Sequence, residues 1–237
     1  DTLYIEYDTL CMKAKEKSAG PRDRAGTGHE AEPGRETDPG PQTKPSRETK
    51  LPQDKNKPNK EPIVIVIEGQ IGVGKTTMGE LLEEELGIEL YRELTNPATH
   101  ELLERFYRNK KRWAFALQVH FLNERFRKIK QIFQDGGGLL DRSIFGDRIF
   151  ADVLHEDGDM EDFEYHTYTT LLDNMLEHAQ DPTLLIYLDC TVDSALERIK
   201  KRNRGIESTI PREYLARLND HYLRWYAGYD ISPKIRI

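Results

Sequence analysis

The stretch Ile63–Thr77, with the sequence IVIVIEGQIGVGKTT, constrains the fold of this chain more than any other segment. Its β-branched residues 63–67 predict a strand that runs directly into a glycine-rich turn. The turn matches G-x-x-x-x-G-K-[ST], in which backbone N–H groups and the start of the next helix surround a phosphate. The matching residues are Gly69, Gly74, Lys75 and Thr76. Because a strand precedes the turn and an amphipathic helix over 78–86 follows it, we interpret the turn as a P-loop rather than an ordinary glycine-rich connection.

A P-loop assigns roles to its residues. Lys75 is expected to reach the β- and γ-phosphates of ATP, and the Thr76 hydroxyl is expected to ligate Mg²⁺. The residues predicted to surround the ATP phosphates are Gly69, Gln70, Ile71, Gly72, Val73, Gly74, Lys75, Thr76 and Thr77.

Composition divides the chain into two parts. Residues 21–60 hold a single large apolar residue, Leu51, among seven prolines and many charges. Such a segment cannot bury enough apolar surface to offset its conformational entropy. We therefore expect residues 1–60 to be a disordered tail, which favours a flexible arm over an interaction arm, and residues 61–237 to form one domain.

The net charge limits the classes of binding partner that we expect, and the number of cysteines indicates the cellular compartment. The formal net charge is −7, which disfavours nucleic-acid polymers and anionic membranes as main partners but allows a small anionic ligand. No run of 18 apolar residues is present, so we expect no membrane span. Cys11 and Cys190 stand alone, which indicates a reducing, intracellular environment. The cytoplasm is the default compartment, with mitochondrion or nucleus open because the chain begins at Asp1.

Strand-like and helix-like segments alternate after the P-loop. Short strands are expected over 88–92 and 139–141, a strand buried on both faces of the sheet over 183–188, and the beginning of a last strand over 234–237. Helices are expected after Pro97, over 112–133, 144–154, 160–179 and 191–202, and from Pro211 at the first helical position. This order predicts an α/β fold with a doubly wound, five-stranded parallel sheet flanked by helices. Its ligand should lie beyond the carboxyl ends of the strands.

Two acidic groups follow strands at that edge. Glu93 ends the second strand, where a carboxylate could accept a proton from an attacking hydroxyl; the alternative is a surface glutamate. After the third strand, Asp141 suits a water-mediated Mg²⁺ contact, and Arg142 suits phosphate or an ion pair with Glu93. Ser143 could equally cap a helix here.

Two further patterns are compatible with a nucleotide substrate. Arg198, Arg202 and Arg204 form a basic run that could neutralise charge during phosphoryl transfer or could simply compensate a helix dipole. Gln118 and Arg125 lie two turns apart on one face of the long helix. They could read a planar base edge or face solvent.

Together these motifs resemble the deoxynucleoside kinases, and most closely the deoxycytidine, deoxyguanosine and deoxyadenosine branch. The shared order is GxxGxGK[ST], a strand-end Glu, Tyr-x5-Trp-x4-Gln-x6-Arg, (D/E)RS-x3-D, R-x3-R-x-R and I-P-x-E-Y-L. The resemblance spans Ile63 to about Tyr226. It implies transfer of the γ-phosphoryl group of ATP, with Mg²⁺, to the 5′-hydroxyl of a deoxynucleoside, and it implies a homodimer.

The resemblance also implies roles for single residues. Glu93 corresponds to the general base; with Lys75 of the P-loop and Arg142 after the third strand, it completes the predicted set of catalytic residues. Tyr107 and Glu207 match a pair that holds the 3′-hydroxyl, and Gln118 matches the glutamine that pairs with the base. Arg125 and Asp147 match an Arg/Asp pair over the base, which implies deoxycytidine or a purine deoxynucleoside rather than thymidine. Trp113 and Phe115 match aromatic residues of the nucleoside pocket, with core packing as the alternative, and Arg198, Arg202 and Arg204 match arginines of a lid.

The chain departs from the family pattern in two places. Phe121 stands near the base where relatives often have a small residue, and the chain ends at Ile237 before a loop that contacts the donor base. Two other functions remain open: a thymidylate-like nucleoside monophosphate kinase and a non-catalytic P-loop interaction module. A regulatory GTPase would need an N-K-x-D motif, which the chain lacks.

Overall fold

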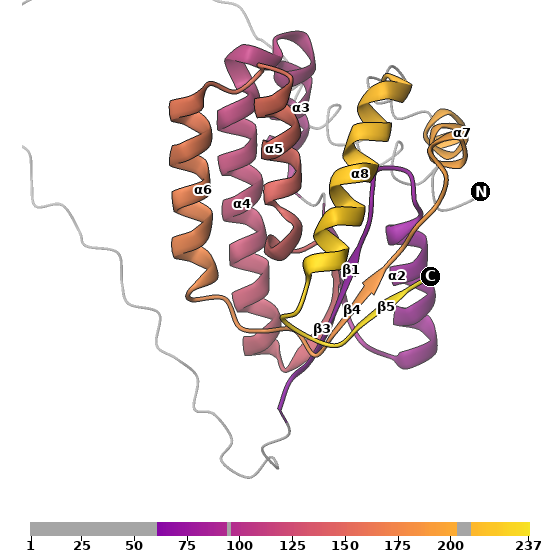
Figure 1. The fold of residues 1–237 in the computed structure, drawn as a ribbon. Coiled ribbons are helices and arrows are strands. Elements are labelled where there is room, and N and C mark those ends of the chain that lie inside the picture. Colours follow the sequence, from indigo (N-terminus) through magenta and orange to yellow (C-terminus); the bar gives the residue numbers. More distant parts are fainter. Residues whose placement is uncertain (1–60, 94–95, 203–209) are drawn as a thin grey trace, which may run out of the picture. The chain divides into compact units, whose positions relative to one another are not determined.

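The computed structural model describes residues 61–93, 96–202 and 210–237. Within these ranges five strands form one sheet in the order β2-β3-β1-β4-β5, and all neighbouring strands are parallel (Figure 1). The strands are β1 (Ile63–Glu68), β2 (Leu90–Tyr91), β3 (Gly137–Asp141), β4 (Leu184–Tyr187) and β5 (Lys234–Arg236). The predicted doubly wound parallel sheet is therefore confirmed.

The central strand β1 is apolar on both faces because helices cover both. Figure 1 shows α2 (Lys75–Leu86) on one side of β1 and α4 (Lys110–Asp135) with α8 (Arg212–Gly228) on the other. Ile67 packs with residues of α2, whereas Val64 and Val66 pack with residues of α4 and α8. The alternation of β-branched side chains thus supplies two separate cores, one on each face of the sheet.

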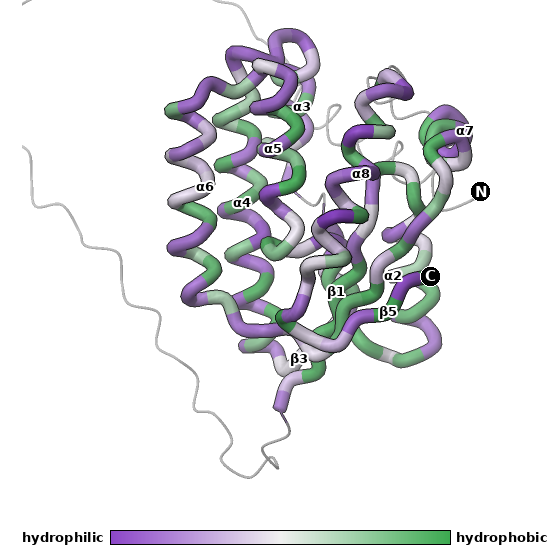
Figure 2. The backbone as a smooth tube through the Cα atoms, in the orientation of Figure 1, coloured by the Kyte–Doolittle hydropathy of each residue, from purple (hydrophilic) through white to green (hydrophobic). Residues whose placement is uncertain are grey.

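A third core lies away from the sheet. Here α3 (Pro97–Arg108), α5 (Arg148–Glu156) and α6 (Asp162–Leu176) pack on the N-terminal part of α4. In Figure 2 hydrophobic residues concentrate along β1 and alternate with hydrophilic ones along α4 and α5, as amphipathic helices require. The remaining helix, α7 (Val192–Arg202), packs against α8 beside the P-loop. The long helix α4 therefore belongs to both the sheet layer and this outer helical layer.

The glycine triplet 136–138 does more than end a helix. Gly136 terminates α4 in the left-handed conformation, with φ of +97°, as the sequence indicated. Gly137 and Gly138 instead belong to β3. A Cβ on Gly137 would lie 2.4 Å from the carbonyl oxygen of Ile63, so this glycine lets β3 approach β1 closely.

Three predicted boundaries are wrong in detail. The strand expected over 88–92 is reduced to the two residues of β2, which pair only with β3 among the described strands. The helix expected over 144–154 begins as a 3₁₀ turn, Ile144–Gly146, before α5 starts at Arg148. Pro211 is the N-cap of α8 rather than its first helical residue.

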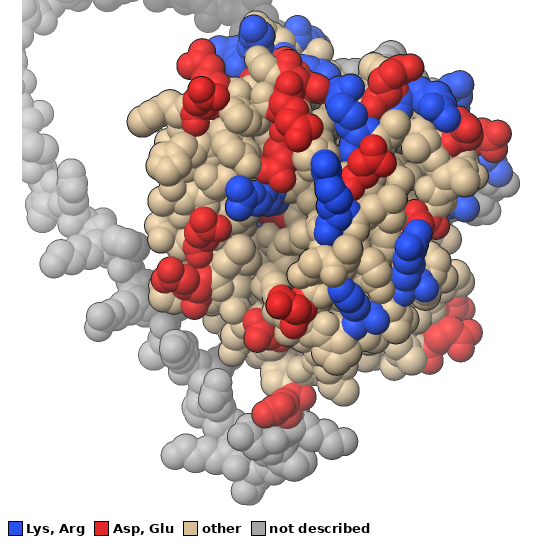
Figure 3. Space-filling model, viewed as in Figure 1, with Lys and Arg blue, Asp and Glu red and all other residues tan. Residues whose placement is uncertain are grey.

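The surface carries charges of both signs. On the face seen in Figure 3, lysine and arginine side chains are interspersed with aspartate and glutamate side chains. No helix in the described ranges has both the length and the apolar character that a membrane crossing requires.

Candidate active site

The P-loop connects the carboxyl end of β1 to the N-terminus of α2. Gly69, Gly72 and Gly74 all have positive φ, at +145°, +82° and +106°. A Cβ on Gly69 would lie 2.4 Å from the carbonyl oxygen of Leu188, so the loop passes directly against the end of β4. No acidic residue stands in the first turn of α2, so its N–H groups and its dipole are available to an anion.

Lys75 is folded back onto this loop. Its Nζ donates to the carbonyl oxygens of Gly69 and Gln70, at 3.0 Å each, and only 7% of the residue is exposed. Burial lowers the pKa of Lys75 to about 8, and the positive charge of Arg142 acts in the same direction. A phosphate in the loop would place further negative charge beside this ammonium group and raise its pKa.

Thr76 and Asp141 lie together, although β1 and β3 bring them from distant parts of the chain. The Thr76 hydroxyl donates to Oδ2 of Asp141 at 2.7 Å. Oδ1 of Asp141 is buried and has no hydrogen-bond partner. A hydroxyl oxygen and a carboxylate oxygen are ligands that Mg²⁺ prefers, usually together with water and substrate phosphates. These two residues fit a magnesium ion that binds with a nucleotide, whereas no group of three His, Cys, Asp or Glu side chains in the described ranges could hold a metal alone.

The basic run lies next to the P-loop. Arg198 of α7 donates from Nη1 to the carbonyl oxygen of Val73 at 2.6 Å. Arg202 is the last residue of α7 and is partly buried. Arg204, and Glu207 of the predicted 3′-hydroxyl pair, fall outside the described residues.

Glu93 lies between two arginines at the same edge of the sheet. Its Oε1 accepts from Nη2 of Arg125 at 2.5 Å and lies 3.0 Å from Nε of Arg142. Burial alone would raise the pKa of Glu93, but the charges of Arg142, Arg125 and Lys75 outweigh it and lower the pKa to about 2. Glu93 is therefore a carboxylate at neutral pH, as the predicted ion pair with Arg142 requires.

The base-reading pair predicted from the sequence is also in contact. Arg125 forms an ion pair with Asp147, which is fully buried at the N-cap of α5. The Phe121 ring lies 4.8 Å from the guanidinium carbon of Arg125 and stacks against its charge. One guanidinium group thus joins the predicted catalytic carboxylate to the predicted base-reading carboxylate.

Gln118 belongs to the same face of α4. It is 4% exposed, and its Oε1 is a buried acceptor without a hydrogen-bond partner. A buried polar atom that lacks a partner is unfavourable unless a ligand or water satisfies it. This atom is consequently available to a donor on a bound molecule.

The aromatic residues predicted to contact the nucleoside do not all lie in one place. Tyr107 and Phe115 are partly buried against the core between α3, α4 and α6. Trp113 packs on this core too, but its ring also carries the guanidinium groups of Arg105 and Arg112, at 5.1 and 4.9 Å. Trp113 lines a shallow pocket of about 440 Å³ together with side chains of α3.

Two residues that contact Glu93 or Arg142 were not predicted from the sequence. Lys128, one turn after Arg125 on α4, donates to the backbone carbonyl of Arg92 and, at 2.8 Å, to that of Glu93. Tyr222 of α8 accepts a hydrogen bond from Arg142. A lysine three residues after Arg125 on a buried face was the available signal for the first; nothing in the sequence indicated the second.

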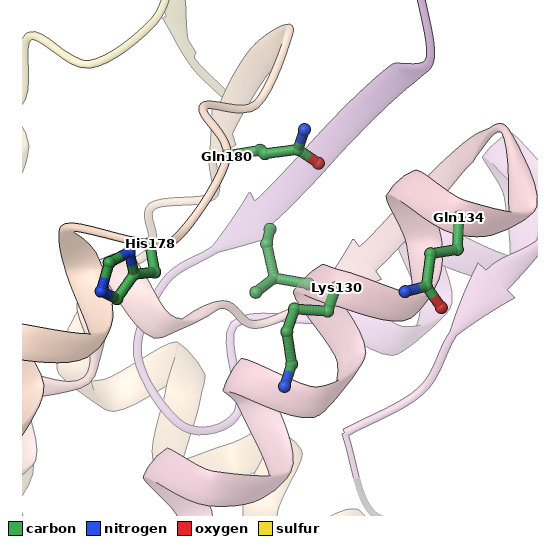
Figure 4. A pocket seen from close by; sticks show the side chains of 5 residues that line it. Lys130, Gln134, His178 and Gln180 are labelled. Atoms are coloured by element: carbon green, nitrogen blue, oxygen red, sulfur yellow. The ribbon is translucent and has the colours of Figure 1, made fainter. Parts of the chain in front are cut away.

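A separate pocket lies at the other end of α4. Figure 4 shows Lys130 and Gln134 of α4 together with His178 and Gln180 from the segment that follows α6. Its volume is about 270 Å³. Because Gln134 lies shortly before the start of β3 and Gln180 shortly before the start of β4, the pocket adjoins the amino ends of the strands and does not belong to the cluster around Glu93.

Comparison with known proteins gives one family. The model of the family described as deoxynucleoside kinase matches residues 65–237. Deoxyadenosine kinase of Lactobacillus acidophilus is 37% identical over 183 residues, which cover 73% of this chain and 84% of that protein. Deoxyadenosine/deoxycytidine kinase of Bacillus subtilis is 36% identical over 178 residues, which cover 73% of this chain and 81% of the relative.

Solved structures agree with these relatives. The structure of deoxyadenosine kinase from M. mycoides with bound dATP superposes with a TM-score of 0.66 and 30% sequence identity. The superposition covers 74% of this chain and 90% of that one. A structure of the same kinase with the products dCMP and a flexible dCDP gives a TM-score of 0.66 at 29% identity.

Proposed function

This chain belongs to the deoxynucleoside kinase family and is a kinase of deoxynucleosides, and we propose that it transfers the γ-phosphoryl group of ATP to the 5′-hydroxyl of a purine deoxynucleoside or deoxycytidine. The observation that carries the proposal is the position of two consecutive residues at the end of β3, the last residue of the strand and the one after it. Asp141 contacts Thr76 of the P-loop, and Arg142 contacts Glu93. A phosphate donor and a hydroxyl acceptor would therefore meet at one turn of the backbone.

The donor half consists of the P-loop and the arginines beside it. Loop N–H groups and Lys75 bind the phosphates of ATP, and Arg198 lies where it can neutralise charge on the transferred group. Thr76 and Asp141 would hold Mg²⁺, which supplies charge neutralisation on the β- and γ-phosphate oxygens when it is bound. We assign Arg202 and Arg204 to the same half as lid residues.

The acceptor half consists of the residues around Glu93. Its carboxylate orients the 5′-hydroxyl and takes its proton as the O5′–P bond forms and the bond between the γ-phosphorus and the leaving ADP oxygen breaks. Because the transition state of phosphoryl transfer is loose, orientation and charge contribute more than basicity, so a carboxylate of low pKa suffices. Arg142 holds Glu93 in place and lies close to the developing charge.

The base is read from α4 and α5. The unpartnered Oε1 of Gln118 supports a hydrogen bond to the base edge. The Arg125–Asp147 pair favours deoxycytidine and the purine deoxynucleosides, because these charged side chains leave no apolar space for the methyl group of thymine. We assign the sugar contacts to Tyr107 and Glu207 and the pocket walls to Trp113 and Phe115.

A substrate panel tests this proposal. Deoxyadenosine, deoxyguanosine, deoxycytidine and thymidine are each assayed with ATP and Mg²⁺, and kcat/KM is compared. We expect at least one of the first three to exceed thymidine by about tenfold or more, because a site that hydrogen-bonds a substrate group rejects analogues that lack it. Thymidine as the best substrate would refute the assignment of Arg125 and Asp147. Phosphorylation of deoxynucleoside monophosphates alone would favour a thymidylate-like kinase.

We further propose that residues 61–237 form the catalytic domain, that residues 1–60 are an extension outside it, and that the chain acts as a homodimer in the cytoplasm. The match of the family model to residues 65–237 supports the boundary, and the free thiol of Cys190 is compatible with a reducing compartment. Removal of residues 1–60 should leave kcat/KM unchanged, and light scattering of the purified protein gives the number of subunits.

A further inference from the structure

Glu68 is an acidic residue at a position of the buried strand β1 where the preceding apolar residues predict another apolar side chain. It ends β1, directly before the first glycine of the P-loop, and is completely buried. Its Oε1 accepts from the backbone N–H of Ser143 at 2.7 Å and from the Ser143 hydroxyl at 3.0 Å. The second oxygen, Oε2, has no hydrogen-bond partner. The Ser143 hydroxyl therefore binds Glu68, and the Ser143 side chain forms no capping hydrogen bond to the 3₁₀ turn that follows it.

The segment that Glu68 holds has an unusual backbone. Arg142 has φ of +72°, and among the residues that the structure describes it is the one non-glycine with positive φ. Side chains rarely adopt this conformation unless the surroundings impose it. Two contacts to β1 impose it here: the N–H of Arg142 donates to the carbonyl oxygen of Ile67 at 3.0 Å, and the next N–H donates to Glu68.

The conformation of Arg142 decides where its guanidinium group lies. The side chain passes over the ring of Phe150, donates to Tyr222 and reaches Glu93 at 3.0 Å. The carboxylate of Glu68 also fills the space beside the 3₁₀ turn, since a Cβ on Gly146 would lie 3.0 Å from Oε1. Glu68 thus lies against Ser143 and against Gly146, at the two ends of the segment 143–146.

We propose that Glu68 is a positioning residue for phosphoryl transfer, which fixes the turn at Arg142 so that this guanidinium group meets Glu93. The proposal rests on the proposed function, because it assigns Glu68 to the site that carries out that reaction. Glu68 does not touch the substrate; it acts through Arg142.

Replacement of Glu68 separates its hydrogen bonds from its charge. Glu68→Gln keeps an oxygen that can accept from Ser143, whereas Glu68→Ala removes the acceptor. Burial raises the pKa of Glu68, and the charge of Arg142 only partly offsets this, so loss of the charge should be tolerated. Val66→Ala is the matched control, because it removes buried volume from the same face of β1 without a change in these contacts.

The first readout is kinetic. We expect Glu68→Ala to lower kcat by on the order of 100-fold, the loss that a displacement of about 1 Å can cause. Glu68→Gln should recover most of that loss, and Val66→Ala should stay near the wild type. In the Arg142→Ala variant, the additional Glu68→Ala substitution should lower kcat by less than about a further threefold. The reason is that the effects of two residues are not additive when one acts through the other. Losses that multiply would overturn the proposal.

The second readout is the pH profile of kcat/KM. Arg142, Arg125 and Lys75 are the cations that lower the pKa of Glu93, and Lys128 contacts its backbone. When Arg142 moves away, the pKa of Glu93 should rise, so the acidic limb of the profile should shift to higher pH in Glu68→Ala and not in Val66→Ala. An acidic limb that stays in place would refute a role through Arg142.

The third readout needs no activity. Amide hydrogen exchange in residues 141–147 should accelerate in Glu68→Ala and remain slow in Glu68→Gln, because the Ser143 N–H loses its acceptor only in the first. Unchanged exchange in Glu68→Ala would overturn the proposal. If the wild-type protein phosphorylates no deoxynucleoside, the proposed function fails, and the exchange experiment still decides whether Glu68 orders the turn.

Discussion

At the scale of single residues, the site is a chain of opposite charges. Asp147, Arg125, Glu93 and Arg142 follow one another, each in contact with the next. Buried charges of this kind are tolerable only when each is paired, and removal of one member leaves its neighbours uncompensated. Every substitution in this series of charges is therefore expected to leave a neighbouring charge without its partner.

Glu93→Gln is the most direct test at this scale. The amide keeps the size of the side chain but cannot accept the proton of the 5′-hydroxyl, so kcat should fall by about 100-fold or more. The KM of the deoxynucleoside should change far less, because Gln118 and Asp147 remain. Steady-state kinetics measure both values. Glu89→Gln, an exposed glutamate just before β2, is the control, and near-normal kcat in Glu93→Gln would refute the assignment of the base.

At the scale of elements, Gly136, which ends α4, and Gly137, the first residue of β3, separate the cost of a left-handed backbone from the cost of a steric collision. Gly136 and Gly137 both have positive φ, +97° and +116°. A Cβ on Gly136 meets nothing within 4 Å, whereas one on Gly137 would meet the carbonyl of Ile63 at 2.4 Å. The first position therefore tests backbone conformation alone, and the second adds a collision between β3 and β1.

Alanine at these positions should give unequal losses of stability. Gly136→Ala should lower the free energy of unfolding by about 1–2 kcal/mol, the cost of a left-handed alanine. Gly137→Ala should cost clearly more, because β3 must move away from the central strand. Urea unfolding of the two variants measures the difference. Equal losses would mean that the close approach of the strands does not limit the residue at 137.

Local patterns of the sequence were enough to predict the elements but not the contacts of the site. The β-branched run 63–67 and the P-loop glycines depend on neighbours in sequence, and both are found as expected. The second strand shrank to Leu90–Tyr91, since its length depends on pairing with β3 alone. Contacts of Glu93 with Arg125 and of Glu68 with Ser143 span 32 and 75 residues, so the spacing of residues in the sequence predicted neither contact.

At the scale of the whole molecule, acid should remove a specific part of the stability. The pKa of Glu93 lies at about 2 in the folded protein, below its ordinary value of 4.5. Its carboxylate therefore stabilises the folded state above about pH 4.5, and this contribution is lost as the pH falls from there toward about 2. Glutamine at position 93 cannot lose a proton, so it lacks the contribution at any pH.

The comparison of wild type with Glu93→Gln isolates this contribution. Near neutral pH the wild type should have the higher free energy of unfolding, and the difference should shrink as the pH approaches about 3.5. Glu68, whose pKa burial shifts in the opposite direction, is present in both proteins and cancels. Urea unfolding at several pH values measures the difference in the free energy of unfolding. A difference that does not change with pH would show that the neighbouring arginines do not lower the pKa of Glu93.

The adjacency of Asp141 and Arg142 bears on how the substrate range of such a chain can be altered. The contacts proposed for the chemistry come from the carboxyl ends of β1, β2 and β3 and from the loops after them, while the residues proposed to read the base stand on α4 and at the start of α5. Laboratory evolution toward another nucleoside could therefore exchange positions such as 118 and 121 without a change in the alignment of donor and acceptor, whereas position 125 also contacts Glu93. Variants selected in this way should gather their substitutions on the two helices and leave the three residues 141–143 untouched.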